Sequence, residues 1–154
     1  MWRESQSFLH SLTNLQFPDN MPLLSILLAS ASGHLVGDLW YNSYTFRPAW
    51  CKFAGKTPLD LDKLGIQPRI VTIASDLTLA CLLDHAVSKL DVGNSCKTAA
   101  MVTGGAALLY TALGAPHNAY DDRHCGCVAI DLGYNAARVG VMSLVLLYMA
   151  GRFE

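Results

Sequence analysis

Two short polar motifs stand inside otherwise apolar stretches of the chain. Residues 38–42 read DLWYN and residues 131–135 read DLGYN, so an aspartate, a tyrosine and an asparagine recur in the same order. A carboxylate beside a phenol and an amide can donate, accept and hold protons, as general acid–base catalysis requires. A charged side chain costs about 2.5–3.5 kcal/mol at the centre of a membrane helix, so these motifs predict a functional site.

Further ionisable residues lie in apolar stretches: His34, Asp76, Asp84 near the far end of its span, and Arg138. Counting about 1.5 Å of helix per residue, the aspartates of the two motifs, Asp76 and Arg138 all lie about 5–15 Å from the same side. At 100° per residue, Asp131 and Arg138 are only about 20° apart in projection. The spacing therefore predicts one polar layer shared by several helices.

We expect the two motifs to form two walls of a single buried pocket, where carboxylates from separate helices meet around a lone guanidinium. A carboxylate without a cation in a low dielectric tends to keep its proton, so such a set can both donate and accept one. Of Asp38 and Asp131, one would activate the nucleophile and the other would donate a proton. The predicted catalytic residues are Asp38, Asp131, Arg138 and Asp76. The residues predicted to orient water or substrate are Tyr41, Asn42, Tyr134, Asn135, His34, Tyr110 and His117.

The elements that must position these residues are membrane-spanning helices. The chain has 154 residues, of which 52% are hydrophobic and only 15% charged, with a mean hydropathy of +0.29. A helix needs about 20 residues to cross a hydrocarbon core. We expect a single membrane-embedded domain over residues 1–154, an all-α four-helix bundle. Its predicted spans are residues 21–44, 70–89, 98–115 and 128–151.

The longest connection, residues 47–69, is expected to lie at the membrane surface. It carries five basic residues and is interrupted by Pro58 and Pro68, and an aromatic cluster typical of a headgroup belt runs into it from Trp40 to Trp50. The excess of Lys and Arg in the first and third loops favours a cytoplasmic side for them. Gly33, Gly37, Gly104 and Gly105 are expected to let helices approach closely.

Several partner classes are disfavoured by composition. The formal net charge of −1 gives no basic stripe for nucleic acid. The HCGC sequence at residues 124–127 offers three potential zinc ligands where a structural site needs four, so we predict no metal and no cofactor, and unpaired thiols. The start of the chain lacks the pattern of a signal peptide, so the first span is expected to stay in the mature protein.

The chain resembles the small four-helix membrane family called domain of unknown function 1761. The resemblance is carried by Gly37, Trp40, Tyr41, Phe46, Ala49, Trp50, Asp131, Gly133 and Tyr134. It implies four spans and brings no established activity. The polar set is similar, by analogy only, to that of limonene-type epoxide hydrolases, a soluble fold in which aspartates and an arginine relay protons while other groups hold the attacking water.

Three functions remain open. The first is a membrane enzyme that opens an epoxide of a lipophilic small molecule, by hydrolysis or cyclisation, located in the endoplasmic reticulum if the chain is eukaryotic. The second is a small proton-coupled transporter, which would require a homo-oligomer because four helices are few. The third is a structural membrane protein in which the polar layer only sets helix register.

Overall fold

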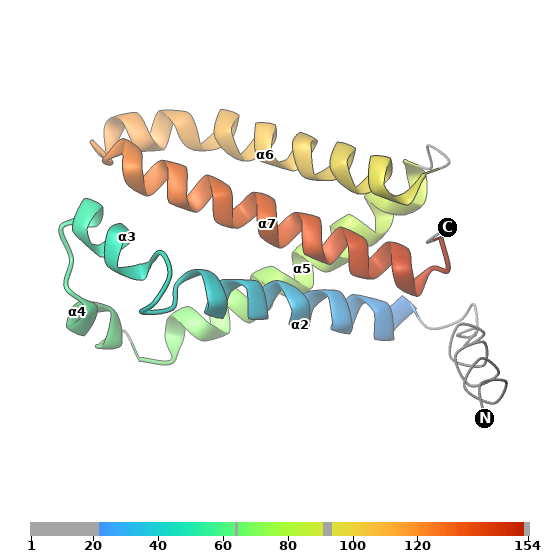
Figure 1. The fold of residues 1–154 in the computed structure, drawn as a ribbon, viewed down its shortest axis with the longest axis horizontal. Helices are drawn as coiled ribbons and strands as arrows, with labels where there is room; N and C mark the ends of the chain where they lie inside the picture. Colours follow the sequence, from blue (N-terminus) through green and yellow to red (C-terminus); the bar gives the residue numbers. More distant parts are fainter. Residues whose placement is uncertain (1–21, 64, 91–93, 153–154) are drawn as a thin grey trace, which may run out of the picture.

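The computed structural model describes residues 22–63, 65–90 and 94–152, and these residues form helices joined by turns. The four long helices are α2 (Pro22–Trp40), α5 (Gln67–Lys89), α6 (Ser95–Tyr120) and α7 (Cys125–Met149). Each is long and apolar enough to cross a membrane. Two short helices, α3 (Arg47–Ala54) and α4 (Pro58–Asp62), lie at one end of the bundle in the connection from α2 to α5 (Figure 1). The predicted all-α four-helix bundle with a longer first connection is confirmed.

Two helix ends differ from the predicted spans by four residues or more. Helix α2 ends at Trp40 rather than Tyr44, because the Thr45 hydroxyl lies 2.6 Å from the Trp40 carbonyl oxygen and the Asn42 side chain accepts the Tyr44 amide in a turn. Helix α6 continues through Pro116 to Tyr120. A proline removes only its own N–H from the ladder, and so close to the end of α6 the helix continues past it.

Helix α7 occupies the middle of the packing, with its most extensive contacts to α2 and α6 and further contacts to α5. A cluster of buried apolar residues fills the interior between these helices. Its buried members are Ala29, Ala80, Leu83, Val87, Ala99, Val102, Val139, Met142, Leu146 and Leu147. Because these residues are shared among all four long helices, their burial fixes which face of each helix carries the polar groups.

Glycines set how closely α2 and α7 approach. A Cβ at Gly33 would lie 2.6 Å from the Met142 sulfur, and one at Gly37 would lie 3.1 Å from the Tyr134 hydroxyl oxygen. The prediction of close approach is confirmed for these two. It is wrong for Gly104 and Gly105, since nothing described lies within 4 Å of a Cβ built there. Both are exposed on the side of α6 turned away from the bundle.

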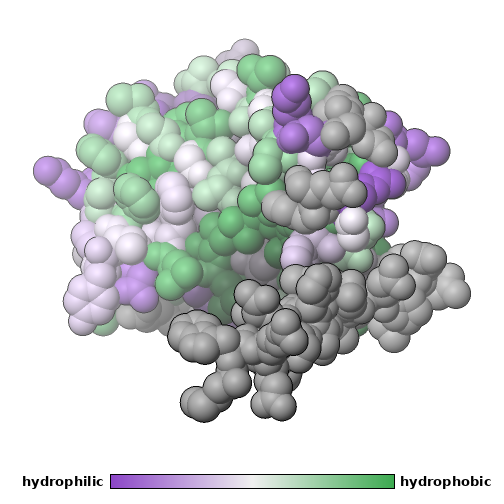
Figure 2. Space-filling model, turned by 45° about the vertical axis from the view of Figure 1, so that its right-hand side comes forward, coloured by the Kyte–Doolittle hydropathy of each residue, from purple (hydrophilic) through white to green (hydrophobic). Residues whose placement is uncertain are grey.

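The outer surface of the bundle is apolar. Leu35 on α2 is 61% exposed and Leu108 on α6 is 74% exposed, and many other large apolar side chains are similarly open. Figure 2 shows apolar side chains over much of the face in view. A soluble domain rarely exposes such large contiguous apolar areas. The surface therefore fits helices that face lipid.

Candidate functional site

The Asp131 carboxylate, on the second turn of α7, collects donors from three other parts of the chain. Its Oδ1 accepts the Tyr41 hydroxyl at 2.7 Å and the Trp50 indole N–H at 2.9 Å, and its Oδ2 accepts an Arg123 N–H at 2.7 Å. Tyr41 follows α2, Trp50 lies on α3, and Arg123 precedes α7. We call Asp131, Tyr41, Trp50 and Arg123 the interfacial centre. It joins the end of the first span to the start of the last.

The pKa values of two groups of the interfacial centre are raised, in each case with a contribution from Asp131. Burial raises the pKa of Tyr41 well above its ordinary value, and its hydrogen bond to Asp131 and the negative charge of that residue raise it further. Burial lowers the pKa of Arg123, but the hydrogen bond and the charge of Asp131 outweigh it, so the pKa is raised. Tyr41 therefore stays a neutral phenol, and Arg123 stays a cation, throughout the physiological range.

A second charged group lies deeper in the bundle. Arg138 on α7 forms an ion pair with Asp76 on α5, and its Nη2 lies 3.3 Å from the Ser75 hydroxyl oxygen. The other Asp76 oxygen lies 3.2 Å from Nδ1 of His34 on α2. Asp76 is fully buried and Arg138 is 7% exposed. We call Asp76, Arg138 and His34 the buried centre.

Two tyrosines connect the centres. The Tyr41 and Tyr134 rings meet edge to face with centroids 5.1 Å apart, and the Arg138 guanidinium carbon lies 5.8 Å from the centroid of the Tyr134 ring. Gly37 admits the Tyr134 hydroxyl against α2. The two DLxYN motifs are thus in contact, through Tyr41 with Asp131 and through Tyr41 with Tyr134.

The expected meeting of Asp38 and Asp131 around Arg138 is wrong. Asp131 pairs with Arg123, and Arg138 pairs with Asp76. Asp131 and Arg138 share a face of α7, but seven residues separate them by about 10 Å along the axis, which is beyond ion-pair distance. The prediction that both side chains lie on the same face of α7 was correct. The prediction that they meet was wrong, because the distance between them along the helix is too large.

Asp38 lies outside both centres. It is exposed, and its carboxylate has no hydrogen bond or ion pair with any described residue. Gly33 and Gly37 lie four residues apart on the side of α2 that faces α7, and Tyr41, four residues further and just after the helix, contacts α7 as well. Asp38 is about 100° from Gly37 around the helix, so it is turned away from that contact.

The predicted substrate-orienting residues divide into three groups. Tyr41, Tyr134 and His34 belong to the centres or to the link between them. Asn42 accepts from Ser43 and Tyr44 in its own turn, and Asn135 donates to the Asp131 carbonyl one helical turn earlier. The two asparagines therefore satisfy local backbone groups. Tyr110 is half-buried on α6 without a side-chain hydrogen bond among the described residues, and the His117 side chain is exposed.

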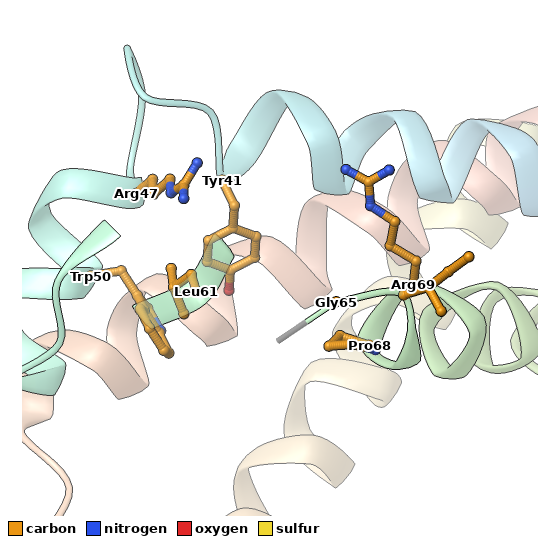
Figure 3. Close-up of a pocket in the computed structure, with 8 residues that line it drawn as sticks. Tyr41, Arg47, Trp50, Leu61, Gly65, Pro68 and Arg69 are labelled. Carbon is orange, nitrogen blue, oxygen red and sulfur yellow. The ribbon is translucent and has the colours of Figure 1, made fainter. Parts of the chain in front are cut away.

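A cavity of about 670 Å³ opens beside Tyr41, beneath the connection formed by α3 and α4 (Figure 3). Tyr41 and Trp50, both donors to Asp131, form one wall. Leu61, Ile66 and Pro68 form an apolar wall. Arg47 and Arg69 also line it, and Figure 3 shows Tyr41 between them. The volume is within the range of small-molecule sites.

Two residues of the interfacial centre were not among the predicted site residues. The sequence predicts Trp50 only as an aromatic residue of the headgroup belt, and it places Arg123 only among the basic residues of the third loop. A half-buried indole N–H needs a hydrogen-bond acceptor. For Trp50 this requirement was the available signal, because it points to a carboxylate from another part of the chain. For Arg123 the available signal was its position in the turn immediately before the helix that carries Asp131.

The HCGC sequence begins α7. The Nδ1 of His124 accepts the Gly126 N–H as a helix cap, and the Cys127 sulfur lies 3.8 Å from the Trp50 carbonyl oxygen. All five cysteines are free thiols. Among the described residues, no three His, Cys, Asp or Glu side chains are grouped as metal ligands.

Comparison with known proteins gives a family without an assigned activity. No curated protein and no solved structure matches the chain. The model of one family, described as protein of unknown function (DUF1761), matches residues 24–147. This range runs from α2 to α7 and includes both motifs, both charged centres and the cavity. The chain therefore belongs to the DUF1761 family.

Proposed function

We propose that the protein is a multi-pass membrane enzyme that binds a lipophilic small molecule in the cavity beside Tyr41 and acts on it by acid–base chemistry. The observation that carries the proposal is the 2.7 Å hydrogen bond from Tyr41, which lines the cavity, to the Asp131 carboxylate. A phenol at a cavity wall with a carboxylate behind it can donate a proton and recover it. The apolar lining residues Leu61, Ile66 and Pro68 give a lipophilic molecule its contact surface.

Epoxide opening is the reaction we propose first. The oxygen of water, or of a hydroxyl within the substrate, forms a bond to one ring carbon while the ring C–O bond breaks. Tyr41 donates its proton to the epoxide oxygen, and the proton lost by the nucleophile returns to Tyr41 through Asp131. Both side chains end as they began, so the reaction requires no cofactor. Arg123 and Trp50 hold the carboxylate during the transfer.

The buried centre has a different role in this proposal. Asp76 and Arg138 pair inside the bundle, away from the residues that line the cavity. We assign them to helix register, with Arg138 also supporting the ring of Tyr134. Asp38, exposed on α2, has no assigned step. In a eukaryotic cell, the endoplasmic reticulum membrane is our proposed location.

The test is turnover of a lipophilic epoxide by purified protein in nanodiscs, with epoxidised oleic acid as the probe. Diol formation in isotopically labelled water reports addition of water, and a cyclic ether from a hydroxylated epoxide reports internal attack. Asp131→Asn and Tyr41→Phe should each abolish turnover, and Asp38→Asn should not. Undiminished turnover in Asp131→Asn, or no product from the wild-type protein, would overturn the proposed reaction.

A proton-coupled transporter is the second candidate, favoured by the contact of Asp76 with His34. His34 is 32% exposed in its side chain whereas Asp76 is fully buried, so the pair could pass a proton from the edge of the bundle to its interior. Four spans are few for a transport path, so a homo-oligomer would be required. Proton flux into liposomes that disappears in Asp76→Asn, with the protein still folded, would select this function over the enzyme.

A further inference from the structure

The cavity beside Tyr41 combines an apolar wall with two cations. Leu61, Ile66 and Pro68 supply the wall, and Arg47 and Arg69 supply the guanidinium groups. The residues that line the cavity include no acidic side chain. Such a distribution matches a molecule with an apolar chain at one end and a negative charge at the other.

The helix ends around the cavity add to its positive character. Arg47 is the first residue of α3, and Pro68 and Arg69 lie in the first turn of α5. The residue before each helix, Phe46 or Ile66, provides no side-chain cap. Amide groups at an uncapped N-terminus and the positive end of the helix dipole both favour an anion.

The surrounding connection is also basic. Residues 47–69 contain five basic and two acidic residues. One of the acids, Asp60, is engaged in its own helix, where it accepts from Thr57 N at 2.9 Å and from Thr57 Oγ1 at 2.7 Å. These hydrogen bonds lower the pKa of Asp60 below its usual value. The Arg69 guanidinium has no carboxylate partner within ion-pair distance among the described residues.

We propose that the ligand of this cavity is an amphiphile with an anionic head, a carboxylate or a phosphate, bound between Arg47 and Arg69 with its chain along Leu61 and Ile66. The inference rests on the proposed function, since it names the substrate class of the same cavity. It places the polar end of the ligand at the basic connection and its chain beside the Tyr41 hydroxyl. A free fatty acid and an anionic phospholipid share this chemistry.

The experiment uses the full chain in nanodiscs of zwitterionic lipid and reads quenching of tryptophan fluorescence by brominated probes. Trp50 lines the cavity, so a bound brominated chain quenches it, and this part of the signal disappears in Trp50→Phe. The probes are a brominated fatty acid, its methyl ester, brominated phosphatidic acid and brominated phosphatidylcholine. Quenching that saturates with the fatty acid alone assigns a free acid as the ligand. Quenching that extends to phosphatidic acid assigns the shared anionic head.

Two matched variants test the role of the cations. Arg69→Gln should raise the half-saturating concentration of the acidic probe about tenfold, since one charge-assisted contact is lost. Lys63→Gln removes the same charge from an exposed residue that does not line the cavity. This variant should change the half-saturating concentration of the acidic probe less than twofold. Equal quenching by acid and methyl ester, or equal effects of the two variants, would overturn the proposal.

The proposed ligand class and the proposed reaction can be disproved independently of each other. Acid-selective quenching without hydrolysis of epoxidised oleic acid would remove the proposed reaction and leave the ligand class intact. Hydrolysis of the epoxidised methyl ester as fast as the acid, without acid-selective quenching, would remove the ligand class and leave the reaction intact.

Discussion

The buried centre and the interfacial centre use similar residues in different surroundings. Each has one aspartate paired with one arginine, and each contacts one of the linked tyrosines, Tyr134 or Tyr41. The side chain of Asp76 is completely buried, whereas that of Asp131 is 13% exposed. Two of the three partners of Asp131, Tyr41 and Trp50, line a cavity, and the partners of Asp76 do not.

This difference in access to a cavity assigns a structural role to the buried centre and a chemical role to the interfacial centre. An ion pair enclosed on all sides has no room for a ligand, and breaking it leaves an uncompensated charge. A carboxylate behind a cavity wall can exchange protons with a ligand through that wall. Residue type alone therefore does not identify the reactive aspartate, but access to a cavity does.

The largest expected effect is on stability, from breaking the buried centre. Asp76→Leu leaves the Arg138 guanidinium buried without its partner and should lower the free energy of unfolding by about 3–5 kcal/mol. The double variant Asp76→Leu/Arg138→Met should recover most of this loss, because both charges are removed. Unfolding in detergent measures both. A double variant as unstable as the single one would show that the pair itself, rather than the orphaned charge, stabilises the bundle.

The next effect is on turnover, from the interfacial centre. Asp131→Asn keeps an oxygen acceptor for Tyr41 but loses the base, so turnover of epoxidised oleic acid should fall at least about 100-fold. Asp38→Asn is the matched control, since it makes the same change on an exposed side chain. Equal rates in the two variants would remove the distinction between these aspartates.

The sequence predicts the fold better than it predicts these pairings. Apolar runs locate four spans because the requirement for about 20 apolar residues is local. The partners of the charges depend on contacts between distant segments. Trp50 reaches Asp131 only because α3 folds back over the start of α7, and no periodicity in residues 47–54 predicts that. The end of α2 likewise depends on the Thr45 side chain individually, and α6 continues past Pro116 instead of ending there.

The match of the two motifs also had a limited meaning. Tyr41 and Asp131, one from each, form the contact that joins them. Asn42 and Asn135 bond locally, and Asp38 is turned away. The repeated motif therefore predicted that the two helix ends meet. It gave no information on which residues of each motif form the contact.

A smaller effect tests the third donor of the interfacial centre. Trp50→Phe keeps the ring but removes the N–H that Asp131 accepts, so the free energy of unfolding should fall by about 1 kcal/mol. Tyr44→Phe, on a ring that is 94% exposed, should leave it unchanged. If both variants unfold like the wild type, the indole contributes no net stabilisation to the centre.

The smallest effect is a shift in titration. Because the pKa of Tyr41 is raised in the folded state, its stabilising contact with Asp131 is complete below the ordinary tyrosine pKa of about 10 and is lost only as pH rises toward the folded-state pKa. The difference in tyrosinate absorbance between wild type and Tyr41→Phe should therefore show no titration near pH 10. A full titration step in that absorbance difference near pH 10 would contradict a buried Tyr41 phenol that is hydrogen-bonded to the Asp131 carboxylate.

The most direct test compares turnover per folded molecule in Asp131→Asn and in Asp76→Leu/Arg138→Met, with epoxidised oleic acid as substrate and the folded fraction measured in the same samples. Our account predicts no turnover in the first and turnover near that of the wild type in the second. Activity that survives the loss of Asp131 but disappears with the buried pair would contradict it.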